Sequence, residues 1–155
     1  FIKNAWLDPS LDSFKNEMCQ YQAVACLQYM TRSEGLDCQS DLYLSLLLCG
    51  LPVEKIEHKT HAPTEKDIQN IDDFLRTCIN YWPAIKGGSV ESFQENWLTR
   101  EGSLTQPLIN GCHEAWLLEV KSAPNDTLIK QSPFSFSSIQ YPWMPKPLHV
   151  NWVID

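Results

Sequence analysis

The hydrophobic periodicity of this chain changes once, near Thr99, and that change restricts the fold more than any other sequence feature. Before it, apolar residues recur at three- and four-residue steps, as in a helix that buries one face. The clearest such run is Ile68, Ile71, Leu75, Cys78, Ile79 and Trp82. After it, apolar and polar residues alternate, which is typical of a strand with one buried face. Helices followed by strands, without regular alternation of the two, predict an α+β fold.

The helical half, residues 13–98, divides into about four helices at residues that commonly start or end them. The expected helices occupy residues 13–31, 40–49, 64–82 and 89–98. Ser13 is expected to cap the first helix, Thr64 to begin the third and Ser89 to begin the fourth. Gly50 is expected to cap the C-terminus of the second helix, since glycine readily adopts the left-handed conformation common there.

The C-terminal half, residues 99–155, is expected to form a hairpin and a final strand. Asn110-Gly111 is a strong hairpin-turn signal between strands over residues 99–108 and 115–121. The final strand contains the alternating apolar residues Leu148, Val150 and Trp152. The sequence therefore predicts an N-terminal helical half packed on a small antiparallel sheet formed by the C-terminal half.

The length of 155 residues is that of one ordinary domain, so we expect residues 1–155 to form a single domain. Residues 1–12 are read as an opening segment with a turn at Asp8-Pro9-Ser10. The chain begins at Phe1 rather than Met, and we expect it to be a piece of a longer polypeptide.

The charge and hydrophobicity of the chain argue against two classes of partner. The net charge is −7, and the 12 Lys and Arg residues are scattered, whereas nucleic-acid binding needs clustered cations opposite phosphates. The longest apolar run, residues 42–51, is shorter than the roughly 20 residues of a membrane span. We therefore expect neither nucleic-acid binding nor a membrane span.

The 6 cysteines lie at positions 19, 26, 38, 49, 78 and 112 and form no C-x-x-C pair. Several fall within helical patterns, where a free cysteine behaves as a small buried hydrophobic residue. This pattern favours reduced, structural thiols and a cytosolic origin.

Residues that carry catalysis or bind metals do not form a recognisable constellation in this sequence. Cys112 and His113 are neighbours near a hairpin turn, so their side chains are expected on opposite faces. His58 and His61 have the spacing of one helix face but lack further ligands at suitable distances, apart from Glu57. The pair Asp72-Asp73 is most simply a solvated helix face. We expect no enzymatic activity, no metal and no cofactor.

The segment Tyr141-Pro142-Trp143-Met144 is the strongest candidate for binding a partner. Prolines in and after it restrict the backbone, so little conformational entropy is lost when it docks. Aromatic residues and methionine are enriched at protein interfaces. We predict that Tyr141, Pro142, Trp143 and Met144 contact a partner protein, the alternative being that the segment lies across the sheet of its own domain.

A set of motifs in fixed order resembles one known family. The motifs are LLLCGLP at residues 46–52, INYWPAIKGGSVESFQENWLTREGSLT at 79–105, AWLLEV at 115–120 and SFSSIQYPWMPKPLHVNW at 135–152. Together they are similar to the tape measure proteins of bacterial contractile injection systems, which are phage tail-like particles. The resemblance covers roughly residues 19–152.

The resemblance implies a structural protein that determines tube length, in which this block is the C-terminal part of the chain. The implied partners are the spike and the baseplate or inner-tube proteins, together with further copies of the same chain, on the order of three or six. The protein would be made in the bacterial cytoplasm and lie in the tube lumen or at the baseplate end of the released particle. The alternative is a toxin effector or cargo domain carried by the same kind of particle.

Overall fold

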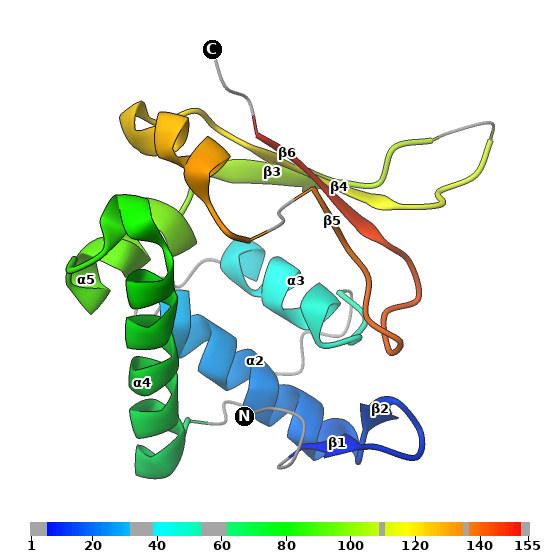
Figure 1. The fold of residues 1–155 in the computed structure, drawn as a ribbon. Coiled ribbons are helices and arrows are strands. Elements are labelled where there is room, and N and C mark those ends of the chain that lie inside the picture. The colour runs from blue at the N-terminus through cyan, green and yellow to red at the C-terminus, as the bar shows by residue number, and fades with distance from the viewer. Residues whose placement is uncertain (1–5, 32–38, 54–61, 109–110, 135–136, 153–155) are drawn as a thin grey trace. The chain divides into compact units, whose positions relative to one another are not determined.

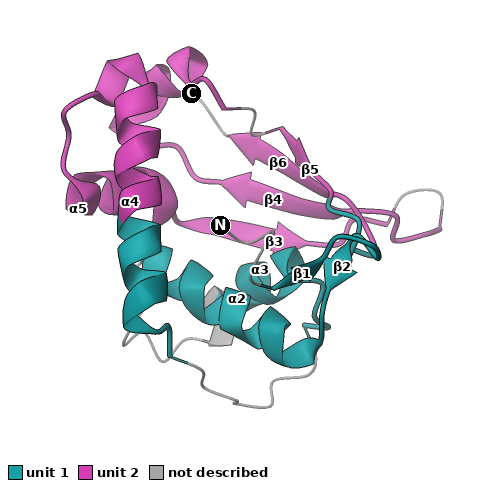
Figure 2. Ribbon diagram, turned by 60° about the horizontal axis from the view of Figure 1, so that its bottom comes forward, with its two compact units in different colours: residues 1–72, 141–145 teal, residues 73–140, 146–155 magenta. Residues whose placement is uncertain are grey.

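The fold is known from a computed structural model, which describes residues 6–31, 39–53, 62–108, 111–134 and 137–152. Helices dominate the first half and a mixed sheet lies in the second, which confirms the α+β class (Figure 1). The chain forms two compact units: unit 1 comprises residues 1–72 and 141–145, and unit 2 comprises residues 73–140 and 146–155 (Figure 2). That residues 1–155 form a single domain stays a prediction.

Unit 1 begins with a short antiparallel hairpin of β1 (Leu7–Asp8) and β2 (Ser13–Phe14). The predicted turn is present, and the Asp8 carboxylate accepts hydrogen bonds from the backbone N–H (2.9 Å) and the hydroxyl (2.6 Å) of Ser10. The expectation that Ser13 caps a helix is wrong, because Ser13 pairs with Asp8 in this hairpin.

The first helix of unit 1 starts after the hairpin. Helix α2 (Glu17–Thr31) is capped by the side chain of Asn16, which accepts a hydrogen bond from the backbone N–H of Cys19 at 2.9 Å. It ends at Thr31 as predicted, and it packs against α3 (Gln39–Leu48). The buried hydrophobic residues described in unit 1 are Trp6, Leu7, Phe14, Ala23, Val24, Ala25, Cys26, Leu46, Leu47, Cys49, Leu51, Ile71 and Met144.

Helix α4 (Glu65–Tyr81) begins next to Thr64, where the sequence predicted its start, and Thr64 caps it. The Thr64 hydroxyl accepts a hydrogen bond from the backbone N–H of Asp67 (3.2 Å), and the Asp67 carboxylate accepts one from the backbone N–H of Thr64 (3.0 Å). This reciprocal pair satisfies two backbone donors that a helix N-terminus leaves without partners. The helix begins in unit 1 and ends in unit 2.

Unit 2 continues from α4 through short helical turns. These are η1 (Pro83–Ile85), α5 (Val90–Phe93) and the π-helical η2 (Gln94–Leu98). The Ser89 hydroxyl accepts a hydrogen bond from the backbone N–H of Ser92 (3.1 Å), as expected of an N-cap. Trp82, which is only 1% exposed, lies with its ring centroid 4.6 Å from that of Trp97. The two tryptophans therefore belong to the core of this unit.

The sheet of unit 2 has four strands in the order β3-β4-β6-β5. These are β3 (Gly102–Thr105), β4 (Trp116–Val120), β5 (Ser138–Ile139) and β6 (Leu148–Trp152). Strands β3 and β4 pair antiparallel as predicted, with Leu104 opposite Leu118, but both are shorter than expected. Asn110 of the expected Asn110-Gly111 turn lies outside the described residues. The expectation of an antiparallel sheet is wrong at its centre, because β4 and β6 run parallel.

The direction of β6 follows from the long connection that precedes it. After β4 the chain forms η3 (Pro124–Gln131) and then β5, which pairs antiparallel with β6 at the sheet edge. A connection of this length allows the chain to return to the starting end of β4, as parallel neighbours require. The alternation in β6 predicted a strand but carries no information about its direction.

The two faces of the sheet differ in polarity, as the alternation of apolar and polar residues in the sequence predicted. Leu104, Leu118 and Val150 are aligned across β3, β4 and β6, and so share one face. Ser103, Glu119 and Asn151 are aligned in the same way on the other face, where all three are exposed. The sheet therefore has one apolar and one polar face.

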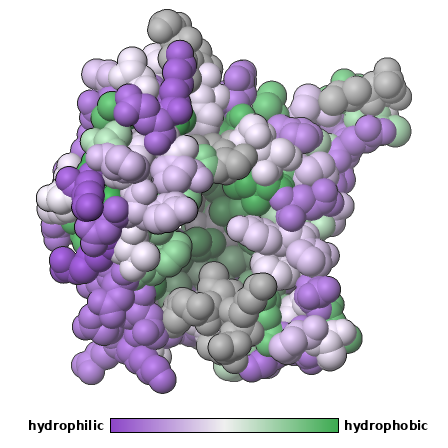
Figure 3. All heavy atoms as spheres, in the orientation of Figure 1, coloured by the Kyte–Doolittle hydropathy of each residue, from purple (hydrophilic) through white to green (hydrophobic). Residues whose placement is uncertain are grey.

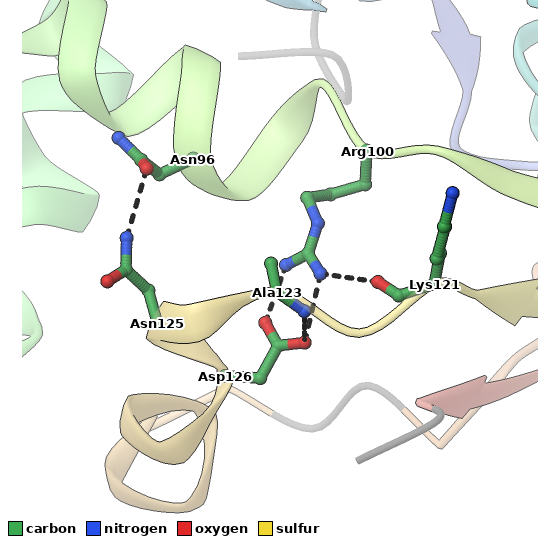
Figure 4. Close-up of polar contacts among 6 residues, drawn as sticks. All are labelled: Asn96, Arg100, Lys121, Ala123, Asn125 and Asp126. Atoms are coloured by element: carbon green, nitrogen blue, oxygen red, sulfur yellow. Dashed lines mark hydrogen bonds and ion pairs between the residues drawn. The ribbon is translucent and has the colours of Figure 1, made fainter. Parts of the chain in front are cut away.

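Arg100 holds together three parts of unit 2 (Figure 4). Its guanidinium donates to both carboxylate oxygens of Asp126, at 2.7 and 3.0 Å, and to the backbone carbonyl of Lys121 at 2.7 Å. The Asp126 carboxylate also accepts from the backbone N–H of Ala123 at 2.8 Å, which caps η3. The guanidinium lies 5.3 Å from the centroid of the Trp152 ring, within the range of a cation–π contact. Arg100 thus connects η3 with the ends of β4 and β6.

We expect Asp126→Asn to lower the free energy of unfolding by about 3 kcal/mol at neutral pH, because it leaves a largely buried guanidinium without its counter-charge. The hydrogen bond from Arg100 lowers the pKa of Asp126 below its ordinary value of 3.8. The stability from the pair is therefore fully present above that ordinary value and is lost as the pH falls below it.

Denaturant unfolding of wild type and Asp126→Asn between about pH 3 and pH 7 tests this expectation. The difference between the two proteins should shrink on acidification. A difference that stays constant over this range would contradict the proposed role of the ion pair.

Candidate partner-binding segment

The four residues predicted to bind a partner, Tyr141, Pro142, Trp143 and Met144, form a tight turn; we call them the YPWM segment. The backbone N–H of Met144 donates to the carbonyl of Tyr141 at 2.9 Å, which closes a β-turn. Pro142 occupies the second position of this turn, where its fixed φ angle is favourable. The segment lies between β5 and β6 in the chain and belongs to unit 1.

The end of α3 explains why this segment packs within unit 1. A helix leaves its last four carbonyls without partners inside the helix. Here the backbone N–H of Leu51 bonds to the carbonyl of Leu46 (2.9 Å), and the N–H of Gly50 bonds to that of Leu47 (3.0 Å). This is the Schellman arrangement, with Gly50 in the left-handed conformation at φ +72°. The predicted C-terminal cap at Gly50 is therefore confirmed.

The remaining two carbonyls are satisfied by side chains from elsewhere in the sequence. The side-chain amide of Gln20, on α2, donates to the carbonyl of Cys49 at 2.9 Å. The indole N–H of Trp143 donates to the carbonyl of Leu48, also at 2.9 Å. Trp143 thus acts as a C-terminal cap for α3, although it lies far away along the chain.

The Trp143 ring is held on two further sides. Its edge meets the Phe14 ring at a centroid distance of 5.1 Å and an interplanar angle of 65°. The Tyr141 ring stacks on it at 4.9 Å and 13°. Both arrangements are favourable for aromatic pairs. Figure 1 shows the connection between β5 and β6 beside the β1–β2 hairpin that carries Phe14.

Gly50 is also where the backbone of the YPWM segment approaches α3 most closely. A Cβ atom at Gly50 would lie 2.5 Å from the carbonyl oxygen of Trp143, a distance that would force the two segments apart. Two sequence motifs, LLLCGLP and the one containing PWM, therefore meet at a point where only glycine fits.

These contacts divide the segment into a held part and an exposed part. Met144 is 4% exposed and Trp143 is half-buried, whereas Tyr141 is 46% exposed and Pro142 is also exposed. The Trp143 side chain contacts Tyr141, Phe14 and the Leu48 carbonyl, all within unit 1. Partner contact stays a prediction for the segment, and Tyr141 and Pro142 are the residues that the structure leaves accessible.

Unit 1 exposes two more large apolar side chains. Leu11, in the β1–β2 turn, is 69% exposed, and Met18, in the first turn of α2, is 66% exposed. In the sequence they flank Phe14, the residue that contacts the Trp143 ring. The hydrophobic periodicity did not indicate that these two side chains are exposed.

The other candidate residues that the structure describes do not assemble into a reactive site. Cys112 and His113 are both exposed, and Nδ1 of His113 lies 2.8 Å from the backbone carbonyl of Gln106. Of the pair Asp72-Asp73 on α4, Asp73 is exposed and Asp72 is half-buried, so only Asp73 agrees fully with the expected solvated face. Figure 3 shows hydrophilic side chains gathered over this helix. His58 and His61 lie outside the described residues. In the described part of the chain no cluster of His, Cys, Asp or Glu is arranged to hold a metal ion.

The described cysteines are Cys19, Cys26, Cys49, Cys78 and Cys112, and all are free thiols. Burial raises the pKa of Cys26 to about 12 and that of Cys49 to about 12, and it also raises the pKa of Cys78. These three thiols are therefore protonated and unreactive at neutral pH. Among the described helices, none is long and apolar enough to cross a membrane.

We expect Trp143→Phe to lower the free energy of unfolding by about 1–3 kcal/mol, because it keeps an aromatic ring but leaves the Leu48 carbonyl without its donor. Tyr141→Ala, which removes an exposed ring from the same turn, is the matched control and should cost less. Thermal and denaturant unfolding measure both. Equal stability of Trp143→Phe and wild type would show that the indole hydrogen bond does not hold the segment.

The comparisons with known proteins are consistent with this arrangement of motifs. A family model described as contractile injection system tape measure protein matches residues 2–152. No curated protein and no solved structure shows significant similarity to the chain. The matched region includes both motifs that meet at Gly50. It also includes Arg100 with its partner Asp126, and the four strands of the mixed sheet. The chain belongs to the family of contractile injection system tape measure proteins.

Proposed function

We propose that this chain is the C-terminal anchor of a tape measure protein that sets tube length, and that it docks at the spike or baseplate end of the tube. The observation that carries the proposal is the family match over residues 2–152, which places the chain in a protein class associated with other tube components. The role is structural rather than catalytic.

A protein can measure length when each of its residues advances the chain by a fixed distance. An extended helix advances about 1.5 Å per residue, so the number of residues defines a distance. Such a ruler needs one end in a fixed position. A folded region with an exposed, rigid contact residue supplies that position better than a flexible tail, because little entropy is lost when it docks.

The YPWM segment has the properties of such a contact. Tyr141 and Pro142 are exposed on a closed β-turn, and the turn is fixed to α3 by Trp143 and to the core of unit 1 by Met144. Tyrosine combines a large apolar surface with a hydroxyl group, which suits it to the centre of an interface. We propose that Tyr141 and Pro142 contact the spike, baseplate or first tube ring, with Trp143 and Met144 positioning them.

A substitution at Tyr141 tests this contact in assembling particles. We expect Tyr141→Ser to reduce the yield of complete particles strongly, while the melting temperature of the isolated chain stays within a few degrees of wild type. Tyr81→Ser is the matched control, since Tyr81 is also an exposed aromatic residue, at 67%, but lies on α4. Particle yield and length are measured by electron microscopy. Normal yield with Tyr141→Ser, or an equal loss with Tyr81→Ser, would contradict the proposed contact.

Stoichiometry separates the anchor from a cargo domain. An anchor on a symmetric spike or ring should be present in a fixed number of copies per particle, on the order of three or six. A toxin effector or other cargo should vary in number from one preparation to another. Quantitative mass spectrometry of purified particles, with the spike protein as the internal standard, gives this ratio, and a variable ratio would favour the cargo role.

A further inference from the structure

Residues 141–152 contribute to both compact units of the fold. Unit 1 includes residues 141–145, and unit 2 includes the residues that follow them, among which is the whole of β6. Because a polypeptide is synthesised from its N-terminus, these residues appear only after the greater part of both units has been made. Their contacts therefore decide when each unit can reach its native structure.

Unit 1 depends on residues 141–145 for contacts with two of its earlier elements, β2 and α3. The Leu48 carbonyl at the end of α3 accepts its hydrogen bond from Trp143, and the buried Phe14 ring of β2 packs against the same indole. Met144 is itself buried in this unit. A buried carbonyl without a donor and an unfilled core position each destabilise a fold. Their combined cost is comparable with the whole stability of a small unit.

Unit 2 depends in the same way on β6. This strand lies between β4 and β5 in the sheet order. The backbone N–H of Trp116, on β4, donates to the Pro147 carbonyl at 2.9 Å, and the N–H of Val150 donates to the Ser137 carbonyl at 3.0 Å. Leu148 is among the most deeply buried side chains. Without β6 the described pairing that remains is the β3–β4 ladder, and an isolated two-stranded hairpin is only marginally stable.

The interval before these residues appear is long compared with the formation of local structure. Residues 73–140 separate the two parts of unit 1, and at about 5–20 residues per second their synthesis takes about 3–14 s. Helices and hairpins form within microseconds. Compact units usually fold in the order of their synthesis, but unit 1 must wait for residues 141–145.

We propose that the fold of this chain is completed from its C-terminal side, so that the docking surface exists only on a chain synthesised through residue 152. The consequence for docking rests on the proposed function, whereas the order of folding does not. A tape measure chain that stops early, or is altered in this stretch, would then be unable to dock even where its earlier residues are intact.

The position of Tyr141 connects the order of folding with docking. Its ring stacks on Trp143 at 4.9 Å, and its carbonyl accepts the hydrogen bond from Met144 that closes the turn. When Trp143 and Met144 are not seated in unit 1, Tyr141 lies on a flexible segment, and docking must then order that segment at an entropic cost. The proposed contact residue thus belongs to the same turn that completes unit 1.

Two buried thiols, Cys26 on α2 and Cys49 just after α3, report on the state of unit 1. The double variant Trp143→Gly with Met144→Gly should make both thiols react with iodoacetamide at least about a hundredfold faster than in wild type, because the unit opens. Mass spectrometry of the peptides that contain each cysteine measures the two rates.

The matched control is the double variant Tyr141→Gly with Pro142→Gly. It changes two residues of the same turn, but both are exposed, so the thiol rates should rise less than about tenfold. Wild-type rates in the Trp143→Gly and Met144→Gly variant would overturn the proposal, since unit 1 would then be complete without this segment. Equal rates in the two double variants would also overturn it.

Val150→Pro tests the dependence of unit 2 on β6. Proline removes the N–H that bonds to the Ser137 carbonyl and does not fit a strand with neighbours on both sides. The amides of β4 should therefore lose at least about a hundredfold of their protection from hydrogen exchange, whereas Val150→Thr, which keeps both the shape and the N–H, should lose less than about tenfold. Unchanged protection of β4 in Val150→Pro would overturn the proposal for this unit.

Particle assembly separates this inference from the proposed function. The Trp143→Gly and Met144→Gly variant retains Tyr141, yet it should reduce the yield of complete particles as strongly as Tyr141→Ser. Fast-reacting thiols together with a normal particle yield would contradict docking through this surface. Slow-reacting thiols together with a reduced yield would contradict the order of folding, because the two residues would then act in docking alone.

Discussion

The hydrogen bond from the Trp143 indole to the Leu48 carbonyl is the contact on which the arrangement of unit 1 depends. It completes the C-terminus of α3, whose other final carbonyls are bonded by Leu51, Gly50 and the side chain of Gln20. A buried carbonyl without a donor costs about 1–3 kcal/mol, so a helix end of this kind needs all its partners. Because one partner comes from near the C-terminus, the helix is complete only when distant parts of the chain have come together.

This dependence gives the exposed part of the YPWM segment its fixed position. Trp143 is held by the helix end and by Phe14, and Gly50 allows its backbone to approach closely. Tyr141 stacks on the held ring and remains accessible to other proteins. The contacts that stabilise unit 1 therefore also hold Tyr141, the proposed contact residue, in place. In unit 2 Arg100 has a similar role. It joins η3 to the end of β4 through hydrogen bonds and to the end of β6 through a cation–π contact.

The sequence predicted those elements that depend on contacts between residues close together in the chain, such as helix starts and helix caps. Helices start at Thr64 and Ser89 as expected, Gly50 adopts the left-handed conformation, and the strand alternation in β4 and β6 is present. The expectation for Ser13 was wrong because a turn held by the Asp8 carboxylate drew Ser13 into a hairpin, and Asn16 supplied the cap instead. In each of these cases the decisive contact spans only a few residues.

Features that depend on distant contacts could not be predicted in the same way. The parallel pairing of β4 and β6 is set by the path of the connection between them, and the alternation of side chains is the same in either direction. The YPWM segment was recognised as unusual from its prolines and aromatic residues, but the contacts of Trp143 with Phe14 and Leu48 leave no pattern in the sequence. Hydrophobic periodicity carries no information about the assembly to which a protein belongs. The resemblance to tape measure proteins supplied this information, and with it the proposed role of the segment.

A density map of an intact contractile particle tests the central claim most directly. The account predicts that residues 141–145 lie in ordered density at the spike end of the tube, with the Tyr141 side chain against a neighbouring protein. Ordered density for this chain elsewhere in the particle, or Tyr141 facing solvent at the spike end, would contradict it.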